Sequence, residues 1–262
     1  MSMTKHPPVR SLILAAGFAT RMKGIDTPKG LINIDGGSRM DRMLADFNAI
    51  PLVGKTAVIA NSKSFPYYKN WLKFPNASRG QNKIKLLNNG VSNKDDKKGA
   101  IGDLIHALDI LGWWNQDLLV MPCDTLYRGT LATFIDFYQM TLSRPGLATI
   151  VYEHPKELIA GRLGCVEIEG NKITRFTEKP EAPFSSLAIA PFYFYPQQVL
   201  NLLKQYVNEG GDKDAPSSII SWLLDRKLPV YAYKTKPSFD LGYPADINTA
   251  RLYLQLETRL IS

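Results

Sequence analysis

Residues 12–31 read LILAAGFATRMKGIDTPKGL, in which an apolar run passes through a bend of small residues into a stretch with three basic side chains. The apolar run predicts a buried β-strand, because a strand covered on both faces shows no polar alternation. The bend ends at Gly17, and its small side chains let a polyphosphate approach the main chain. Beyond it, Arg21 can fork onto outer phosphates and Lys29 can reach a phosphate as a mobile charge. The stretch therefore predicts a strand followed by a phosphate-binding loop.

The loop by itself leaves two interpretations open. It is neither a GxxxxGK[ST] loop nor a GxGxxG fingerprint, which removes the main support for a kinase or a dehydrogenase. An ordinary strand-to-helix turn with basic residues on the surface fits the same letters, because short glycine motifs often match by chance. The rest of the chain has to decide between the two.

Apolar runs and amphipathic stretches alternate through the first half of the chain. The runs SLILAAG, KTAVIAN, KIKLLNN and DLLVMPCD predict strands, and MDRMLADFNAI, FPYYKNWLKF and IGDLIHALDILGWW predict helices. This alternation is typical of βαβ units, so we expect an α/β fold with a mostly parallel sheet and helices on both faces. Several large aromatic residues are assigned to packing in and around the core: Trp113, Trp114, Phe134, Phe137 and Tyr138.

The pattern changes after Pro145. LATIVYE, GCVEIEGNKITRFTEK and LAIAPFYFY predict strands, with a hairpin turn at the Glu-Gly-Asn step. Two helical stretches (PQQVLNLLKQYV and PSSIISWLLDRK), a strand (PVYAYKT) and a C-terminal helix from about Ala245 follow. No linker rich in Gly, Ser or Pro divides the halves. We therefore expect one domain over residues 1–262, with a nucleotide-binding lobe at 1–145 and a second substrate-binding lobe at 146–262.

Composition narrows the classes of protein. The 262 residues are 45% hydrophobic and 21% charged, as in an ordinary globular protein. The net charge of +8 is spread along the chain without a basic stripe or an aromatic-basic motif, so we expect small phosphorylated substrates rather than a nucleic acid. Cys123 and Cys165 form no CxxC or Cys/His cluster, which predicts two reduced thiols. No stretch has the roughly 20 apolar residues of a membrane span, so the expected location is cytoplasmic, with no membrane partner.

Two aspartates lie at positions that favour a metal-ion site. Asp124 ends the apolar run DLLVMPCD, at the edge where an α/β sheet presents side chains to its ligand crevice, and Asp240 follows the last predicted strand. Magnesium favours one or two carboxylates and takes phosphate oxygens and water as its other ligands. Each aspartate alone is more often a turn residue or a helix cap, but together they predict a Mg²⁺ site.

These features together resemble the sugar-1-phosphate nucleotidyltransferase family, which includes glucose-1-phosphate thymidylyltransferases and mannose-1-phosphate guanylyltransferases. The family's first loop reads approximately L-A-[AG]-G-x-G-[TS]-R-[LM], followed by P-K. The residues that fit are Leu14, Ala15, Ala16, Gly17, Thr20, Arg21, Met22, Pro28 and Lys29. Ala19 replaces the usual second glycine; if that position needs a positive φ, alanine costs about 1 kcal/mol there. The resemblance implies a Rossmann-like, nucleotide-diphospho-sugar transferase fold with a mixed, mostly parallel sheet.

The resemblance also implies roles for individual residues. The nucleotide-binding residues would be Leu14, Ala15, Ala16, Gly17, Phe18, Arg21, Lys29 and Gly102. Arg21, Lys29 and Asp124 would be catalytic, and Asp124 with Asp240 would bind the metal. Gly102 lies in KKGAIGDLIHAL and would pack against the base, although a flexible helix start explains it nearly as well.

The family's metal-binding aspartates define a second match. One lies at a strand end, as Asp124 does, and the other lies in a D-[IVL]-G-[TS]-P-x-D-x-x-x-A motif near the C-terminus. The second motif is fitted by Asp240, Gly242, Pro244, Asp246 and Ala250. Tyr243 and Cys123 stand where the family has a small hydroxyl residue and a glycine. These changes alter local shape and keep both carboxylates.

The motif F-x-E-K-P supplies the second substrate's site. Here it reads RFTEKPE, and the resemblance assigns Glu178 to sugar hydroxyls, Lys179 to the sugar phosphate and Gly164 to a close backbone approach to the sugar. An extended Glu-Lys pair points its side chains in opposite directions. As residues of a simple surface strand, the pair would be unremarkable.

The implied activity is transfer of a nucleoside monophosphate from an NTP to a sugar 1-phosphate, giving an NDP-sugar and pyrophosphate with Mg²⁺. The expected partners are those two substrates, and a homo-oligomer is left open because relatives often form one. One alternative is cytidylyl transfer to another phosphorylated alcohol such as phosphocholine. Another is a non-catalytic regulatory homologue that binds a nucleotide sugar.

Overall fold

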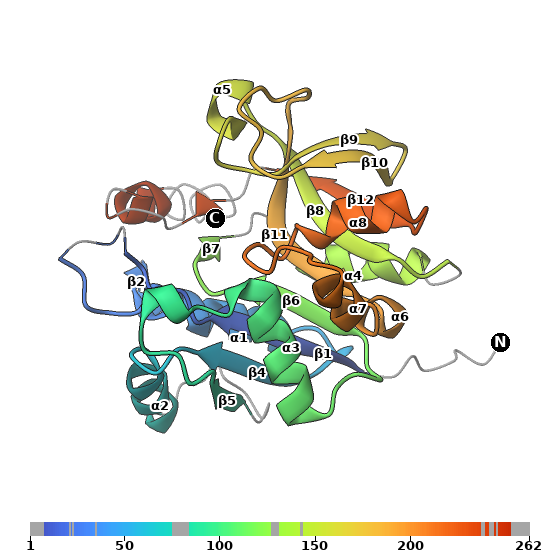
Figure 1. The fold of residues 1–262 in the computed structure, drawn as a ribbon. Coiled ribbons are helices and arrows are strands. Elements are labelled where there is room, and N and C mark those ends of the chain that lie inside the picture. The colour runs from blue at the N-terminus through green and yellow to red at the C-terminus, as the bar shows by residue number, and fades with distance from the viewer. Residues whose placement is uncertain are drawn as a thin grey trace.

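The predicted first strand is β1 (Val9–Ala15), which lies in the N-terminal half of the central sheet (Figure 1). The computed structural model describes residues 8–20, 22, 24–34, 36–74, 84–126, 131–141, 144–236, 239–240, 244 and 246–252, with only the backbone at 239–240. In this part of the chain the main sheet has nine strands. The other eight are β4 (Val53–Ala60), β5 (Lys85–Asn88), β6 (Leu118–Pro122), β8 (Leu147–Glu153), β9 (Cys165–Glu169), β10 (Lys172–Thr177), β11 (Leu187–Tyr195) and β12 (Val230–Thr235).

The strand order is β5-β4-β1-β6-β11-β8-β12-β10-β9. The first four strands run parallel to one another, as the alternation of strands and helices predicts. In the other half β8 and β12 are parallel, whereas β11 runs antiparallel to β6 and β8 and β10 runs antiparallel to β9 and β12. The sheet is therefore mixed. The chain leaves β1 toward β4 on one side and returns to β6 on the other, and ligands of open α/β sheets bind at such a switch point.

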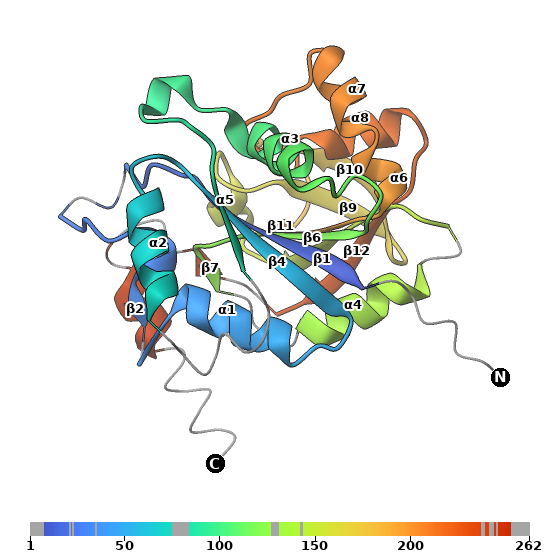
Figure 2. The same ribbon diagram turned by 90° about the horizontal axis from the view of Figure 1, so that it is seen from below.

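Helices cover both faces of the sheet, as Figure 2 shows from below. The helices are α1 (Arg39–Asn48), α2 (Phe65–Lys73), α3 (Gly99–Leu111), α4 (Leu131–Met140), α5 (Lys156–Ile159), α6 (Gln197–Leu200), α7 (Leu203–Asn208) and α8 (Ile219–Asp225), with 3-10 turns η1 (Lys29–Leu31) and η3 (Lys94–Asp96). One core cluster holds the apolar faces of α1 and α4, and the other holds those of α3, α7 and α8. Successive residues of β1 contribute to opposite clusters, Leu12 to one and Ile13 to the other, because side chains alternate along a strand.

Two short pairings complete the sheet structure near the site. β2 (Asn33–Ile34) pairs with β3 (Gly37–Ser38), and β7 (Thr125–Leu126) pairs with β13 (Phe239–Asp240). A third apolar cluster, which includes Ile34, Leu126 and Ile247, joins these segments to the C-terminal helix. The C-terminal region is thus packed beside the turn that follows β6.

Most predicted elements are confirmed. The expected hairpin is β9 and β10, and Gly170 turns it with a φ of +59°. The predicted helix PQQVLNLLKQYV is two short helices, α6 and α7. The C-terminal helix is confirmed at 244 and 246–252, and its remaining positions lie outside the described residues. Both cysteines are buried and free, as expected. None of the described helices combines the length and apolar character that crossing a bilayer requires.

The sequence pattern does not predict α4. Its residues LATFIDFYQM include β-branched and aromatic types with only moderate helix propensity, so packing has to stabilise the helix. Phe134 and Tyr138 are buried on it, and Tyr138 stacks on Phe194 of β11 with ring centroids 3.5 Å apart. The expectation that these aromatic residues pack in the core is confirmed.

Candidate functional site

The loop after β1 has the shape that its small residues suggest. A Cβ placed on Gly17 would meet nothing within 4 Å, so the main chain is open to a ligand there. Ala19 has a φ of +48°, the left-handed conformation in which alanine is strained by about 1 kcal/mol. Within the described part of the chain, the backbone N–H groups of Gly17, Phe18 and Ala19 donate to no protein acceptor. The loop therefore presents unpaired donors of the kind that bind phosphate. Arg21 lies outside the described residues.

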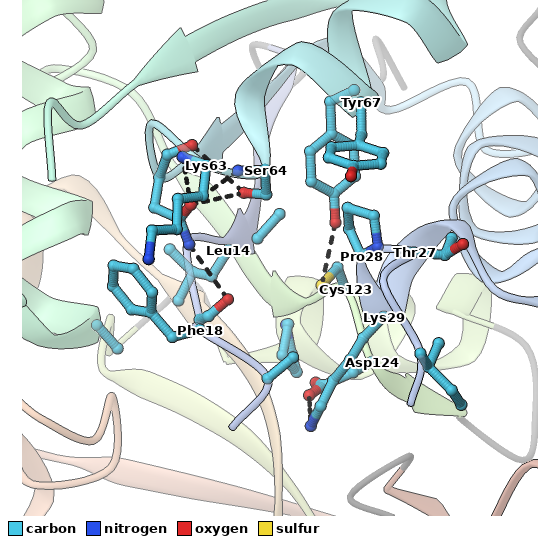
Figure 3. Close-up of a pocket in the computed structure, with 18 of the residues that line it drawn as sticks. Leu14, Phe18, Thr27, Pro28, Lys29, Lys63, Ser64, Tyr67, Cys123 and Asp124 are labelled. Atoms are coloured by element: carbon cyan, nitrogen blue, oxygen red, sulfur yellow. Dashed lines mark hydrogen bonds and ion pairs between the residues drawn. The ribbon is translucent and has the colours of Figure 1, made fainter. Parts of the chain in front are cut away.

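Two crevices, each of about 520 Å³, open on either side of this loop. The first crevice lies toward α2 and β6 and is lined by Asn61, Tyr67 and Asp124 among others (Figure 3). The second crevice lies toward α3 and is lined by residues that include Lys97 and Asp103. Residues of the loop line both crevices, and so does Lys29. Of the predicted nucleotide-binding residues, Leu14, Ala15, Gly17 and Phe18 line the first crevice and Ala16 lines the second.

Lys29 and Asp124 form an ion pair at this site. The Lys29 Nζ lies 2.9 Å from Asp124 Oδ2, and the two side chains are 14% and 23% exposed (Figure 3). Lys29 begins the 3-10 turn η1 after Pro28, and Asp124 follows the carboxyl end of β6. The opposite charges of this partly buried pair neutralise each other when no ligand is bound. An anionic ligand could become the partner of Lys29, and a cation the partner of Asp124.

The residues next to Lys29 and Asp124 in the chain are tightly packed. A Cβ on Gly30 would lie 2.9 Å from both Cys123 Cβ and Tyr68 Oη, so position 30 has room only for glycine. The Tyr68 hydroxyl donates to Cys123 Sγ at 3.7 Å. Burial, followed by the charge of Asp124, raises the pKa of the Cys123 thiol to about 12. Cys123 therefore stays protonated at neutral pH and acts as packing rather than as a nucleophile.

The backbone brings Asp240 to the same place as Asp124. Asp240 pairs with Thr125 in the β13–β7 ladder, one residue from Asp124, although the Asp240 side chain lies outside what the structure describes. The Thr125 carbonyl accepts a 2.7 Å hydrogen bond from Nε of Arg39, which is only 3% exposed. Burial lowers the pKa of Arg39 to about 10, against the negative charge of Asp46, so the guanidinium remains charged at neutral pH. Arg39 thus holds β7, the strand that follows Asp124 and pairs with the strand of Asp240.

The donor set fits a magnesium ion. Carboxylates at two adjacent strand ends, beside a crevice where phosphate oxygens can complete the shell, match the preference of Mg²⁺ for few protein ligands. Among the side chains that the structure describes, no three His, Cys, Asp or Glu residues gather around one point. A site that uses only two carboxylates and its substrate's phosphates does not require such a group.

The residues predicted for the second substrate form a neighbouring cluster. Glu178 Oε2 accepts a 2.6 Å hydrogen bond from Ser217 Oγ, and a Cβ on Gly164 would lie 3.3 Å from that same oxygen. The same Cβ would lie 2.7 Å from the Phe176 ring, so Gly164 is small because an aromatic ring packs on it. Gly164, Glu178 and Lys179 line neither crevice; the nearest link is Pro216, which lines the first crevice and precedes Ser217 in the chain.

Glu178 and Lys179 do not diverge as an extended pair would, and that expectation is wrong. β10 ends at Thr177, and Lys179 adopts a φ of +46° immediately before Pro180. The turn brings Lys179 Nζ to 3.6 Å from Glu178 Oε1, although both side chains keep access to solvent. A residue before a proline is usually extended, so the left-handed conformation of Lys179 has no signal in the local sequence.

Gly102 lines neither crevice, although Gly99, Ala100 and Asp103 of the same helix line the second. It lies in the first turn of α3 with its Cα facing Lys98 Cβ, 3.0 Å from where its own Cβ would be. The tighter position is Gly99, which has a φ of +75° and would place a Cβ 2.2 Å from the Lys213 carbonyl oxygen. The carbonyls of Lys213 and Asp214 accept from the first amides of α3, at Ile101 N (3.0 Å) and Ala100 N (3.2 Å).

Three side chains at the site are missed by the sequence analysis. Asn61 follows β4 and hydrogen-bonds the loop, Ser217 supports Glu178, and Arg39 supports Thr125. Asn61 has a signal that could identify it, since it is a polar residue directly after a buried strand at the ligand-binding edge of the sheet. Arg39 and Ser217 carry no such signal, because their partners come from distant parts of the chain.

The chain is similar to known nucleotidyltransferases along most of its length. The family model described as Nucleotidyl transferase matches residues 10–256. The UTP–glucose-1-phosphate uridylyltransferase AglF of Haloferax volcanii is 25% identical over 95% of this chain and 98% of its own length. A candidate mannose-1-phosphate guanyltransferase of Sulfolobus acidocaldarius is 24% identical over 97% of this chain, which spans 64% of that relative.

A solved structure shares the fold. The crystal structure of a candidate glucose-1-phosphate thymidylyltransferase from Bacillus anthracis, in complex with sucrose, superposes with a TM-score of 0.77 over 94% of both chains. Its sequence is 17% identical to this one, so the likeness concerns the arrangement of the mixed sheet and its helices.

Proposed function

The chain belongs to the nucleotidyl transferase family, and we propose that it transfers a nucleoside monophosphate from an NTP to a sugar 1-phosphate, releasing pyrophosphate. The names of its relatives support this class of acceptor, since they are a glucose-1-phosphate uridylyltransferase and a mannose-1-phosphate guanyltransferase. The resemblance to this family that the motifs indicate agrees with the family match.

One observation carries the proposal. The unpaired backbone amides of the loop, the Lys29–Asp124 pair and a crevice of about 520 Å³ lie together at the carboxyl edge of β1 and β6. Phosphoryl and nucleotidyl transfer require positioning and charge neutralisation rather than a protein nucleophile. The crevice supplies donors for phosphate oxygens, one mobile cation and one carboxylate. These are the groups that are needed to bind a triphosphate.

The step itself balances without a covalent enzyme intermediate. An oxygen of the sugar 1-phosphate attacks the α-phosphorus in line, a new P–O bond forms, and the bond to the β-phosphate oxygen breaks with its electron pair leaving on pyrophosphate. In our proposal the loop amides and Arg21 hold the triphosphate, and Lys29 binds at the α-phosphate, where charge increases during attack. Lys29 leaves Asp124 for the phosphate as the substrate binds.

Asp124 and Asp240 are the residues that would hold Mg²⁺. The ion would neutralise charge on the phosphates and so favour pyrophosphate as the leaving group. The adjacency of Thr125 and Asp240 in the β7–β13 pair supports this role, because it brings the two aspartates within one residue of each other along paired strands. Arg39 supports it further by fixing the Thr125 carbonyl.

The acceptor would bind beside Gly164, Glu178 and Lys179, which Ser217 links to Pro216 on the wall of the first crevice. Glu178 is oriented by Ser217 and would accept hydrogen bonds from sugar hydroxyls, and the exposed ammonium of Lys179 would bind the sugar phosphate.

The sheet topology supports the finer fold assignment. The β5-β4-β1-β6 order with its crevice at the switch point supports a Rossmann-like, nucleotide-diphospho-sugar transferase fold. We treat 1–262 as one domain, because β6 from the first lobe pairs with β11 from the second.

Pyrophosphate release tests the proposal. The enzyme is assayed with Mg²⁺ against each common NTP, TTP included, combined with a panel of sugar 1-phosphates and with phosphocholine. We expect release with at least one NTP and sugar 1-phosphate pair, and a loss of about a hundredfold or more in kcat for Asp124→Asn. Asp109→Asn is the matched control, since Asp109 is an exposed carboxylate paired with Lys204 on the outer surface, and its activity should be unchanged.

Two other results would contradict the proposal. Release only with phosphocholine would identify a cytidylyltransferase for another phosphorylated alcohol. No release with any pair, together with thermal stabilisation by an NTP or an NDP-sugar, would identify a regulatory binding protein.

A further inference from the structure

Asn61 is a buried amide at the edge of the site. It directly follows β4, is 2% exposed, and lies between the loop after β1 and the start of α2. A buried amide must find partners for both its donor and its acceptor, since leaving either unpaired costs about 1–3 kcal/mol. Asn61 satisfies both, and each half of the amide contacts a different segment.

The donor half holds the loop. Asn61 Nδ2 donates to the carbonyl oxygen of Ala16 at 2.9 Å and to that of Gly17 at 3.3 Å. Two successive carbonyls of the loop are therefore turned toward β4. Left unrestrained, these oxygens could face the crevice, where they would repel a polyphosphate.

The geometry of the peptide bond relates the direction of these two carbonyls to the direction of the neighbouring backbone N–H groups. In a planar trans peptide, the C=O of one residue and the N–H of the next point in opposite directions, and the described chain has no cis peptide. Fixing the carbonyls of Ala16 and Gly17 on Asn61 therefore directs the N–H groups of Gly17 and Phe18 away from it. Those amides donate to no acceptor among the described residues, and the space over Gly17 is open.

The acceptor half holds the start of α2. Asn61 Oδ1 accepts from Ser64 N at 2.9 Å, Lys63 N at 3.0 Å and Ser64 Oγ at 3.1 Å. An aspartate would make these same bonds, because a carboxylate oxygen accepts from the backbone amides of a turn as an amide oxygen does. The donation to Ala16 and Gly17 is what an aspartate cannot supply, so the two functions of the side chain can be separated by one substitution.

We propose that Asn61 is a positioning residue of the nucleotide site, which fixes the loop so that the amides of Gly17 and Phe18 receive phosphate oxygens. This rests on the proposed function for its place in turnover, but phosphate binding can be measured separately. Asn61 itself contacts the loop and not the reacting atoms. Its removal should therefore weaken polyphosphate binding while leaving the acceptor site as it is.

The test uses Asn61→Asp in the full chain. The substitution keeps the size of the side chain and its acceptor role in the turn before α2, and it removes the donor to the loop. Binding of inorganic tripolyphosphate, measured by calorimetry, should weaken about tenfold or more, because two oriented amides are lost to a charged ligand. With the substrates identified by the pyrophosphate assay, KM for the NTP should rise by a similar factor, and KM for the sugar 1-phosphate should change less than about twofold.

Two controls separate this from simpler effects. Thr27→Asp adds the same charge to the wall of the first crevice, away from Asn61, and it should weaken tripolyphosphate binding less than about threefold, as a screened charge does. Ser62→Ala removes the hydroxyl next to Asn61 in the chain, whose partner among the described residues is Asn88, and should change nothing. An effect of Asn61→Asp no larger than that of Thr27→Asp would overturn the proposal.

A second measurement covers the case in which Asn61→Asp does not fold. In the wild-type protein, addition of tripolyphosphate should shift the amide NMR signals of Gly17 and Phe18, and unchanged signals at a saturating concentration would refute the proposal. Tripolyphosphate binding that depends on Asn61, without pyrophosphate release from any substrate pair, would instead refute the proposed function and leave this inference standing.

Discussion

Alanine substitution of two glycines at opposite ends of α3 should have very different costs. Gly99 is the first residue of α3 and Gly112 directly follows its last residue, Leu111, and both have a positive φ, +75° and +66°. An alanine at either position meets the left-handed penalty of about 1–2 kcal/mol, part of which is returned because glycine has more freedom in the unfolded chain. Gly112 has open space around it, so Gly112→Ala should cost about 1 kcal/mol.

Gly99→Ala carries a second cost, because its Cβ would lie 2.2 Å from the Lys213 carbonyl oxygen and 3.0 Å from the Asp214 nitrogen. Ordinary contact begins at about 3.4 Å, so the 213–214 backbone has to move by more than about 1 Å. That movement disturbs the hydrogen bonds from Ala100 N and Ile101 N, each worth about 1 kcal/mol, in addition to overpacking at about 1–3 kcal/mol. Gly99→Ala should therefore be about 2–4 kcal/mol less stable than Gly112→Ala.

Equilibrium urea unfolding at one temperature measures both variants. The midpoint should fall for each, with an m-value close to that of the wild type, because the surface exposed on unfolding is the same. In thermal unfolding the expected difference corresponds to roughly 4–16 °C between the variants. Equal losses in Gly99→Ala and Gly112→Ala would refute the reasoning, since only one of the two positions faces backbone.

Three further predictions concern the site. Ala19→Gly should stabilise the protein by up to about 1 kcal/mol in urea unfolding, because it relieves the left-handed alanine, and a loss of stability would contradict the strain at Ala19. Ser217→Ala removes the donor to Glu178 Oε2 and should raise KM for the sugar 1-phosphate about five- to tenfold, with KM for the NTP unchanged; equal changes in both would contradict the assignment. Burial, opposed by the Asn89 amide, raises the pKa of Asp103 above 3.8, so the contribution of this carboxyl to stability is lost as pH rises from about 4 through its folded value. In urea unfolding, the stability of Asp103→Asn relative to the wild type should therefore rise as the pH increases from about 4, and a difference that stays constant with pH would contradict the raised pKa.

The first half of the fold can be predicted from the sequence because each of its elements has a local signal. The run SLILAAG is apolar throughout, and the helices beside it show amphipathic periodicity, so βαβ units follow from the pattern alone. The antiparallel position of β11 between β6 and β8 has no such signal. It depends on long-range pairing, because β11 belongs to the second lobe and pairs with β6 of the first lobe as well as with β8.

The site divides in the same way. Lys29 and Asp124 could each be predicted as site residues, Asp124 because it follows a buried strand and Lys29 through the P-K motif, whereas their 2.9 Å ion pair had no signal in the sequence. The positive φ of Ala19 follows the expectation for a position where the family has glycine. The ion pair between Glu178 and Lys179 could not be foreseen from strand geometry, because a turn before Pro180 replaces the extended conformation. The contribution of Ser217 depends on a contact across 39 residues, which no local pattern encodes.

Isotopic labelling tests the central claim, nucleotidyl transfer by attack at the α-phosphate, most directly. The enzyme is incubated with Mg²⁺, a sugar 1-phosphate and an NTP labelled with ³²P at either the α or the γ position, and the products are separated. The account predicts that the α label appears in the NDP-sugar and the γ label in pyrophosphate, each only when both substrates are present. A γ label on the sugar, or release of labelled orthophosphate without an acceptor, would contradict it.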